Sequence, residues 1–343
     1  MRILVIGGTN FMGPLVVRSL SEQGHEVTVF HRGQTRADLP CGVKELLGDR
    51  RSLAENVVEL QRLAPEVVLD MIPAIEQDAV EVMSVFRGVA LRVVAISSQD
   101  VYQAFGRVNG KESGPVESGQ ITEESPLREN LYPYRSETPR DQDDPKRWQD
   151  DYDKILVERV VMSDAGLPGT ILRLPMVYGP GDYQHRLFSY LKRMDDHRPA
   201  ILLDEAEAQW RWTHGYVENV ADAIAMAVTD ERAAGRIYNV GEPFTLTMAE
   251  WVEKVGKSAG WQGKVVLVPR GSLPEPLRWG INAEQDIVVD TSRIREELGY
   301  KERVDLEKAL RSTVTWERAN PPQEIDAKEF DYVTEDAFVN AMK

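Results

Sequence analysis

The sequence predicts an α/β fold, in which a doubly wound parallel sheet is followed by a smaller C-terminal α+β lobe. Short runs rich in Val and Ile alternate with stretches of helical periodicity through the first half of the chain. Most of these runs are continuously apolar, which is typical of strands covered on both faces. The first run leads directly into a glycine-rich turn and a helix. This succession indicates parallel strands joined by right-handed helical crossovers.

The first half of the chain supplies most of the sheet. We expect strands at Ile3–Ile6, Glu26–Phe30, Val43–Leu47, Val67–Asp70 and Arg92–Ile96. Helices are expected between them at Pro14–Gln23, Ser52–Leu63 and Glu76–Phe86. The segment Gln103–Asp151 interrupts the pattern because it is rich in Gly, Ser, Pro and charged residues. A loop of that length without structure is uncommon unless it is functional.

The second half resumes the pattern and then departs from it. We expect helices at about Asp150–Ala165, Arg186–Met194, Val217–Val228, Met248–Ser258, Ser292–Leu298 and Leu306–Trp316, with strands at Thr170–Arg173 and Arg236–Val240. These elements suggest a sheet domain over residues 1–180, with return elements at about 213–240, and a substrate lobe over 181–320. Residues 321–343 form an acidic tail, which docks either on its own lobe or on a partner.

Composition excludes several classes of protein. The 343 residues carry 41 Lys and Arg against 56 Asp and Glu, a net charge of −15, which argues against binding nucleic acid or anionic membranes by bulk charge. No apolar run approaches the roughly 20 residues of a membrane span, and no signal-peptide core is present. The single cysteine, Cys41, and five isolated histidines give no disulfide framework and no metal site. We expect a soluble cytoplasmic protein.

The strongest motif is the glycine-rich turn after the first strand, which consists of Gly7, Gly8, Thr9, Asn10, Phe11, Met12 and Gly13. The glycines permit a tight turn and close backbone approach, so that a pyrophosphate can bind at the helix N-terminus. The strand–turn–helix context predicts a Rossmann-type dinucleotide site. Asn10 stands where the usual pattern has its middle glycine, and its side chain crowds the diphosphate path.

The residues after the second and third strands bear on the choice of dinucleotide. Arg32 stands where an acidic residue would bind the ribose 2′-hydroxyl, so that NADP is preferred over NAD. The alternative is a solvated arginine. Asp49 is placed either to accept from an adenine amino group or to cap the next helix. We include Asp49 and the adjacent Arg50 among the candidate cofactor-binding residues.

Several later motifs resemble one family. They are Val93–Tyr102, Leu172–Asp182, Tyr216–Ala221, Tyr238–Gly241 and Asp290–Tyr300. In order and character they are similar to the motifs of extended short-chain dehydrogenases/reductases, the NAD-dependent epimerase/dehydratase family. The resemblance covers about residues 1–317 and is specific for the superfamily, not for a substrate. It also implies that Ser97 and Pro175 lie beside the cofactor, and that the chain forms a homodimer.

The resemblance implies a catalytic Ser, Tyr and Lys, with Tyr and Lys four residues apart on one helix. In that arrangement the ammonium lowers the pKa of the phenol, which then exchanges a proton while hydride moves to or from the nicotinamide. Ser98 and Lys154 match the serine and lysine. The residue four before Lys154 is Asp150, which would form an ion pair with it on a helix. Tyr152, only two residues away, should face elsewhere.

Three interpretations of this departure remain open. In the first, another phenol supplies the proton: Tyr102, Tyr178, Tyr132 or Tyr134. In the second, Asp150 or a nearby carboxylate acts as the base. In the third, Lys154 helps to bind the cofactor and catalysis has been lost.

The second lobe should bind the substrate. By resemblance, Tyr178, Arg186, Arg211 and Trp212 fall where extended members hold a nucleotide-sugar. Arg211 offers a planar fork for phosphate, and Trp212, on one strand face with Trp210, offers a stacking surface. Core packing of the tryptophans and a surface ion pair of Arg211 are the alternatives. The sequence therefore indicates an NAD(P)-dependent oxidoreductase, epimerase or dehydratase that acts on a nucleotide-sugar or a similar hydroxylated small molecule.

Asn10 and the missing tyrosine together resemble an atypical branch of the superfamily, the chloroplast stem-loop-binding proteins and their bacterial relatives. Members of that branch share the Gly-Gly-Thr-x-Phe-x-Gly opening. The alternative function is therefore a non-catalytic NAD(P)-binding regulatory or RNA-binding protein. The net charge of −15 argues against nucleic acid as a partner.

Overall fold

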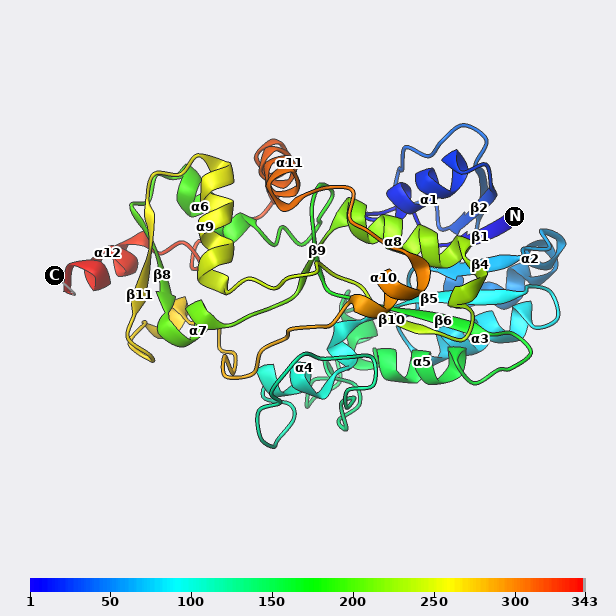
Figure 1. The fold of residues 1–343 in the computed structure, drawn as a ribbon, viewed down its shortest axis with the longest axis horizontal. Helices are drawn as coiled ribbons and strands as arrows, with labels where there is room; N and C mark the ends of the chain where they lie inside the picture. Colours follow the sequence, from blue (N-terminus) through cyan, green and yellow to red (C-terminus); the bar gives the residue numbers. More distant parts are fainter. Residues whose placement is uncertain (342–343) are drawn as a thin grey trace.

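The computed structural model describes residues 1–341 and confirms the predicted doubly wound parallel sheet (Figure 1). Within these residues one sheet contains seven strands in the order β10-β6-β5-β4-β1-β2-β3, all paired in parallel. They are β1 (Arg2–Ile6), β2 (Glu26–His31), β3 (Lys44–Leu47), β4 (Val67–Asp70), β5 (Arg92–Ser98), β6 (Gly169–Leu174) and β10 (Ile237–Asn239). The strand order reverses between β1 and β4, and open sheets of this kind bind ligands at the carboxyl ends of the strands beside that reversal.

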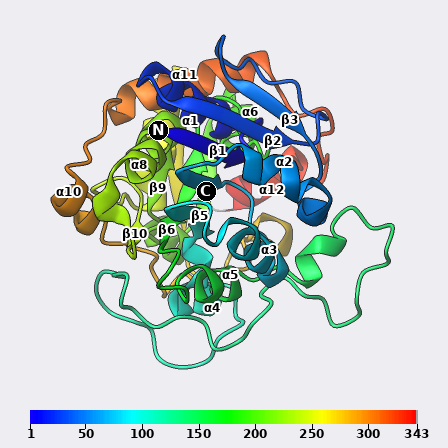
Figure 2. The ribbon, with the colours of Figure 1, turned by 90° about the vertical axis from the view of Figure 1, so that its right-hand side faces the viewer.

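Helices cover both faces of the sheet (Figure 2). α1 (Gly13–Glu22) and α8 (Val217–Thr229) pack together on one face, and α3 (Glu76–Phe86) and α5 (Lys154–Val161) on the other. The side chains of β1 divide between the two cores: Ile3 and Val5 join the first, and Leu4 and Ile6 join the second. This division explains why the strand is apolar at successive positions.

Two predicted helices differ from the structure. The helix predicted over Ser52–Leu63 is a 3-10 helix over Arg50–Asn56, which is interrupted at Ser52, followed by α2 (Val57–Arg62). The helix predicted from about Asp150 begins only at Lys154, because the Asp153 carboxylate accepts from the Ile155 N–H and caps it there. The predicted loop before it contains α4 (Gln103–Val108) and a 3-10 helix over Arg147–Asp150.

The second lobe is built from segments on both sides of α8 and β10 (Figure 1). It contains α6 (Phe188–Asp195), β8 (Ala200–Asp204), α7 (Glu205–Gln209), α9 (Met248–Ala259), β11 (Lys264–Val268) and α11 (Leu306–Ala319). β8 pairs in parallel with β11, and α9 packs against α6 and α11. β7 (Met176–Tyr178) pairs in parallel with β9 (His214–Tyr216), and α10 (Ser292–Leu298) packs near β10.

The acidic tail docks on its own lobe rather than extending as a featureless segment. Its last described part is α12 (Tyr332–Ala341), a helix that the sequence did not predict. The Glu335 carboxylate is buried and accepts from Arg193 Nε at 2.9 Å, while the Tyr332 hydroxyl donates to Asp196 at 2.6 Å. The ring of Phe330 packs edge-on against Phe188. The tail thereby fastens to both ends of α6.

None of the helices within residues 1–341 has the length and apolar character required to cross a membrane. In the same residues, no group of three or more His, Cys, Asp or Glu side chains is arranged to hold a metal ion.

Candidate functional site

The glycine-rich turn forms a cradle between β1 and α1. Gly7 and Gly8 have φ angles of +88° and +86°, a conformation that favours glycine. A Cβ at Gly13 would lie 2.5 Å from the Gly8 carbonyl carbon, so only glycine allows the helix to approach the turn this closely. No side chain of the described residues caps the N-terminus of α1. The Gly13 N–H donates to the Asn10 carbonyl at 2.9 Å and Pro14 has no N–H, so the cradle offers a dinucleotide pyrophosphate close approach to the backbone and the positive end of the α1 dipole.

Asn10 modifies this cradle without filling it. Its side chain is exposed, and its Oδ1 accepts from the Phe11 N–H at 3.0 Å. Phe11 consequently adopts a φ of +49°, which is uncommon for an aromatic residue. The asparagine therefore satisfies one of the backbone donors that the turn would otherwise present to a ligand.

The residues predicted to contact the adenosine end separate into two environments. Arg32 is exposed directly after β2, where the Gly33 N–H donates to His31 Nδ1 at 3.1 Å and stabilises the turn. Asp49 caps the following 3-10 helix by accepting from the Arg51 N–H at 2.9 Å. Its neighbour Arg50 is buried in ion pairs with two carboxylates, those of Asp70 at the end of β4 and Asp78 in α3. The structure therefore places the Arg50 side chain in the core and not at an open surface.

Lys154 lies at the carboxyl edge of the sheet. Its Nζ donates to the Ile96 carbonyl at 2.9 Å and to the Pro73 carbonyl at 2.5 Å, so that it joins the ends of β5 and β4. Burial lowers the pKa of this ammonium to about 8, although the nearby Asp100 and Asp70 carboxylates act in the opposite direction. A cation is thus fixed beside the crevice at the strand-order reversal.

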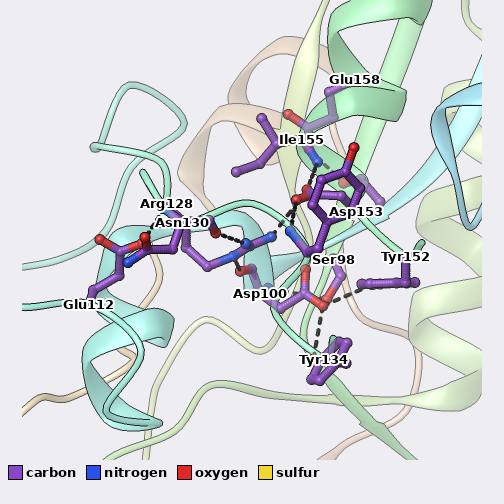
Figure 3. Close-up of polar contacts among 12 residues, drawn as sticks. Ser98, Asp100, Glu112, Arg128, Asn130, Tyr134, Tyr152, Asp153, Ile155 and Glu158 are labelled. Carbon is purple, nitrogen blue, oxygen red and sulfur yellow. Dashed lines mark hydrogen bonds and ion pairs between the residues drawn. The ribbon is translucent and has the colours of Figure 1, made fainter. Parts of the chain in front are cut away.

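Two phenols meet one carboxylate, that of Asp100 (Figure 3). The hydroxyls of Tyr152 and Tyr134 donate to Asp100 Oδ2 at 2.8 and 3.0 Å. Lys154 Nζ lies 5.8 Å from the centroid of the Tyr152 ring. Tyr152 precedes the helix rather than belonging to it, so the prediction that it faces away from the lysine is wrong.

Asp100 has unusual surroundings for a carboxylate. Its second oxygen, Oδ1, is buried and has no hydrogen-bond partner among the described residues. Burial raises the pKa of Asp100, while the Arg128 charge, the two phenols and Lys154 oppose that shift. The backbone N–H of Asp100 donates to Ser98 Oγ at 3.1 Å, which places the predicted serine next to it. The Arg128 guanidinium in turn donates to the Asp100 carbonyl and to Asp153 Oδ1, the latter at 3.2 Å.

Asp150 does not contact Lys154. Its carboxylate accepts from the Arg140 backbone N–H at 2.8 Å and from the Arg140 guanidinium, and Arg147 lies 3.6 Å away. The predicted ion pair between residues 150 and 154 is wrong because no helical turn joins them. The structure therefore brings Ser98, Asp100, Tyr152 and Lys154 together, and leaves Asp150 outside that group.

Two other candidates lie in a buried polar network beneath the site. The Tyr102 hydroxyl donates to Asn239 Oδ1 at 2.6 Å and accepts from Arg173 at 2.9 Å, and burial raises its pKa to about 12. Ser97 Oγ donates to Glu158 Oε1 at 2.5 Å. Both side chains are buried, and they link the end of β5 and the turn after it to α5, β6 and β10.

The predicted substrate-binding residues also differ in exposure. Tyr178 is completely buried, and its hydroxyl donates to Glu242 at 2.8 Å. Arg186 is held by Asp182 at 2.6 Å, whereas the side chain of Arg211 bonds to the Thr245 carbonyl at 2.8 Å. Trp212 is half-buried, with its ring 5.4 Å from that of the buried Trp210; the two rings meet although residues 210–212 form no strand. Pro175 is half-buried between β6 and β7.

Sequence reasoning missed Asp100, Arg128 and the position of Tyr152. Asp100 was visible within the motif that supplied Ser98, two residues further along. Asp153 stands just before Lys154 and the apolar residues that follow it, and an aspartate in that place signals the start of a helix. Reading that signal would have placed Tyr152 outside the helix. Nothing in the spacing of Arg128 indicates that it would be buried between Asp100 and Asp153.

Known proteins resemble the chain over most of its length. It is 26% identical over 300 residues to 2′-dehydrokanamycin reductase of Streptomyces kanamyceticus, covering 85% of this chain and 75% of that protein. It is 24% identical over 327 residues to a chloroplast stem-loop binding protein of Arabidopsis thaliana, covering 90% and 77% of the two chains. The solved UDP-glucose 4-epimerase of Thermotoga maritima, determined with UDP-glucose, has a TM-score of 0.68 at 18% identity, covering 93% and 99%. This last likeness establishes the fold.

Residues 3–241 match the sequence model of the NAD dependent epimerase/dehydratase family. The match includes the glycine cradle, the strand that ends at Ser98, and Lys154 with its partners. It also covers more than half of the chain. The chain therefore belongs to the NAD-dependent epimerase/dehydratase family.

Proposed function

We propose that the protein is an NAD(P)-dependent oxidoreductase, epimerase or dehydratase in which Asp100 and Tyr152, beside the matching Lys154, take the place of the usual tyrosine. The observation that carries this proposal is the Asp100 carboxylate. One of its oxygens is held by two phenols, and the other is buried without a partner among the described residues. A buried polar atom without a partner is costly and calls for an explanation, which a substrate hydroxyl supplies.

The glycine cradle and Arg32 are the residues that would hold the cofactor. Gly7, Gly8 and Gly13 allow the pyrophosphate to approach the N-terminus of α1. The exposed Arg32 guanidinium suits a 2′-phosphate and supports a preference for NADP over NAD. The bound nicotinamide supplies the hydride acceptor or donor. The family name and the reductase relative support a nicotinamide cofactor.

The proton role falls to Asp100. As a carboxylate it takes the proton of a sugar hydroxyl whose carbon loses hydride, and as an acid it returns that proton when the carbonyl is reduced. The raised pKa brings this exchange closer to neutrality than an ordinary aspartate allows. The Tyr152 hydroxyl donates to Asp100 Oδ2 and so leaves Asp100 Oδ1 for the substrate. The charge of Lys154 stabilises the ionised form of the Asp100 carboxylate. This is the carboxylate interpretation of the sequence, with Asp100 in place of Asp150.

A nucleotide-sugar or a similar hydroxylated molecule is the substrate class that we infer. Arg211 forms no close ion pair in the described chain, although the Glu250 carboxylate lies near enough to feel its charge, so its guanidinium is available to a phosphate. Trp212 presents a half-buried ring for stacking against a base or sugar. Two of the similar proteins support a sugar substrate. The solved epimerase was determined with UDP-glucose, and the Streptomyces relative is named as a reductase of 2′-dehydrokanamycin.

The non-catalytic alternative has one supporting observation, the similarity to a stem-loop binding protein. The net charge of −15 opposes it, because RNA binding ordinarily releases counterions to a basic surface. A protein of that kind would bind the dinucleotide or RNA without turning over any sugar.

The test is a titration with NADPH and NADH, followed by nicotinamide fluorescence, and then a turnover screen with UDP-glucose and amino-sugar ketones. Asp100→Asn keeps an acceptor for both phenols but cannot take a proton. We expect it to bind the dinucleotide as the wild type does and to lose turnover, whereas the exposed control Asp151→Asn keeps both. Failure of the wild type to bind either dinucleotide would refute the proposal. So would full activity in Asp100→Asn.

A further inference from the structure

Asp150, the residue that replaces the usual tyrosine, anchors the segment Tyr134–Arg140 of the long loop. The Arg140 N–H donates to Asp150 Oδ2 at 2.8 Å, and the Arg140 guanidinium pairs with Oδ1. The same guanidinium donates to the Tyr134 carbonyl at 3.1 Å. The Arg135 Nε donates to the Asp150 carbonyl at 2.7 Å. One residue thus fixes both ends of the segment, although it lies ten residues beyond Arg140.

The anchored segment delivers a side chain to the catalytic carboxylate. Tyr134 stands at its start, and its hydroxyl reaches Asp100 Oδ2 at 3.0 Å (Figure 3). The Tyr134 ring packs against Tyr152 with centroids 5.2 Å apart, and Trp148 packs edge-on against Tyr152 from the other end of the loop at 5.8 Å. The loop therefore covers Asp100, whose side chain is enclosed in this arrangement.

The environment of Asp150 is built for this contact. Its side chain is only 4% exposed, which is unusual for an aspartate that does not itself contact the reacting groups. The neighbouring Asp151 is 50% exposed and makes looser pairs with Arg135 and Arg147 at 3.4 and 3.0 Å. A buried carboxylate satisfied by a backbone N–H and a guanidinium holds the loop in one geometry.

We propose that Asp150 is a positioning residue: through Arg140 it latches the loop 131–150 closed, and the closed loop sets Tyr134 on Asp100 and excludes water from the reacting carboxylate. The proposal rests on the proposed function of Asp100. Because Oδ1 is inaccessible while the loop is closed, substrate enters when the latch opens, and the latch then reforms over it.

The latch has a signature in the titration of Asp100. The groups that face this carboxylate are Arg128, Lys154, Tyr134 and Tyr152. Burial is the largest influence on its pKa and raises it, whereas the phenol hydrogen bonds lower it. Tyr134→Phe keeps the loop closed and removes a hydrogen bond, so the pKa of Asp100 should rise. Asp150→Asn opens the loop and admits water, so the pKa should fall.

Two measurements on the full chain test the latch without a substrate. The first is limited trypsin digestion at the arginines of the loop, with cut sites assigned by mass spectrometry. We expect Asp150→Asn and Arg140→Gln to be cut after Arg135 about tenfold faster than the wild type, because the loop then opens without unfolding the core. The control Asp143→Asn removes an exposed carboxylate of the same loop that does not pair with Arg135, and it should be cut at the wild-type rate.

The second measurement is the pH titration of the Asp100 side-chain carbon by NMR in protein labelled at aspartate, with Asp100→Asn to assign the signal. The expected result is a higher pKa in Tyr134→Phe, a lower one in Asp150→Asn and Arg140→Gln, and no change in Asp143→Asn. Near-ultraviolet circular dichroism confirms that each variant is folded.

The outcomes separate the two proposals. Wild-type resistance to trypsin in both latch variants would overturn the latch. An open loop with an unchanged Asp100 titration would overturn the positioning of Tyr134. If the wild type turns over no substrate, the proposed function fails, and both measurements still decide whether Asp150 closes the loop.

Discussion

The hydroxyl of Tyr152 lies 2.8 Å from Asp100 Oδ2, although 52 residues separate the two in the chain. The contact exists because α5 begins at Lys154 and leaves Tyr152 in an extended segment directed at the end of β5. A phenol thus reaches the site without standing four residues before the lysine. The family's usual helix spacing is therefore not the only backbone route that places a phenol near this ammonium.

Replacing Tyr152 with Phe should slow turnover about tenfold at neutral pH. The phenol hydrogen bond favours the ionised form of Asp100, so its loss raises the pKa of that carboxyl and moves the acid limb of the pH–rate profile to higher pH. Dinucleotide affinity should not change. Tyr332→Phe, in the tail helix and remote from the site, serves as the control. An unchanged acid limb would show that Tyr152 does not act on Asp100.

Replacing Arg32 with Ala should weaken NADPH binding about thirtyfold and leave NADH binding unchanged, because only the 2′-phosphate uses the guanidinium. Fluorescence titration with each dinucleotide measures both values. Arg62→Ala is the matched control, since Arg62 lies beside Arg2 and Lys44 at the amino ends of the strands, opposite the carboxyl ends where Arg32 lies. Equal losses for the two dinucleotides would mean that Arg32 acts on the adenosine as a whole.

Glu242 makes stability depend on pH in the second lobe. Its carboxyl accepts from Tyr178, and burial raises its pKa from 4.5 to about 7. Between those values the folded protein binds a proton that the unfolded chain has released. Stability is therefore lost as pH rises through this window, and the loss is complete above about 7.

Glu242→Gln keeps the acceptor for Tyr178 and removes this penalty. We expect it to raise the free energy of unfolding by about 3 kcal/mol at pH 8 and by almost nothing at pH 4. Urea denaturation at the two pH values measures the difference. A gain of the same size at both would contradict a titration and indicate a change in packing.

Replacing Glu335 with Ala should release α12 from the second lobe. The buried carboxylate pairs with both Arg193 and Arg198. Its removal leaves these two partly buried guanidinium groups without that partner, which should lower the free energy of docking α12 by about 3 kcal/mol. Hydrogen exchange should accelerate over residues 332–341 and remain slow in the sheet. Glu324→Gln, at an exposed position in the same tail, should leave the exchange of α12 as it is. If α12 stayed protected from exchange in Glu335→Ala, the ion pairs of Glu335 would not be what holds this helix to the lobe.

The sheet was predictable because each of its strands carries its own signal. The apolar runs at β1, β4 and β5 are continuous, and the glycine turn after β1 needs no distant residue to define it. The helices whose faces follow a 3.6-residue period, such as α9, were located to within a residue. These features depend on neighbours in sequence.

The parts of the site that escaped prediction depend on distant partners. Arg50 follows β3 as a ligand-binding residue would, but carboxylates 20 and more residues away enclose it. Asp153 ends the extended segment and starts α5, yet its carboxylate also bonds to Arg128 and to the Tyr132 N–H from the long loop. Such buried charge pairs leave no periodic pattern, so sequence alone placed Asp150 rather than Tyr152 beside Lys154.

The position of β10 at the edge of the sheet bears on how the chain folds while it is being made. β6 and β10 pair at Ile171 and Ile237, and most of the second lobe's first segment lies between them. During synthesis the outer edge of β6 stays unpaired until β10 has emerged, and an unpaired apolar edge is a site of aggregation. A fragment that ends before residue 237 should be insoluble however complete its glycine cradle.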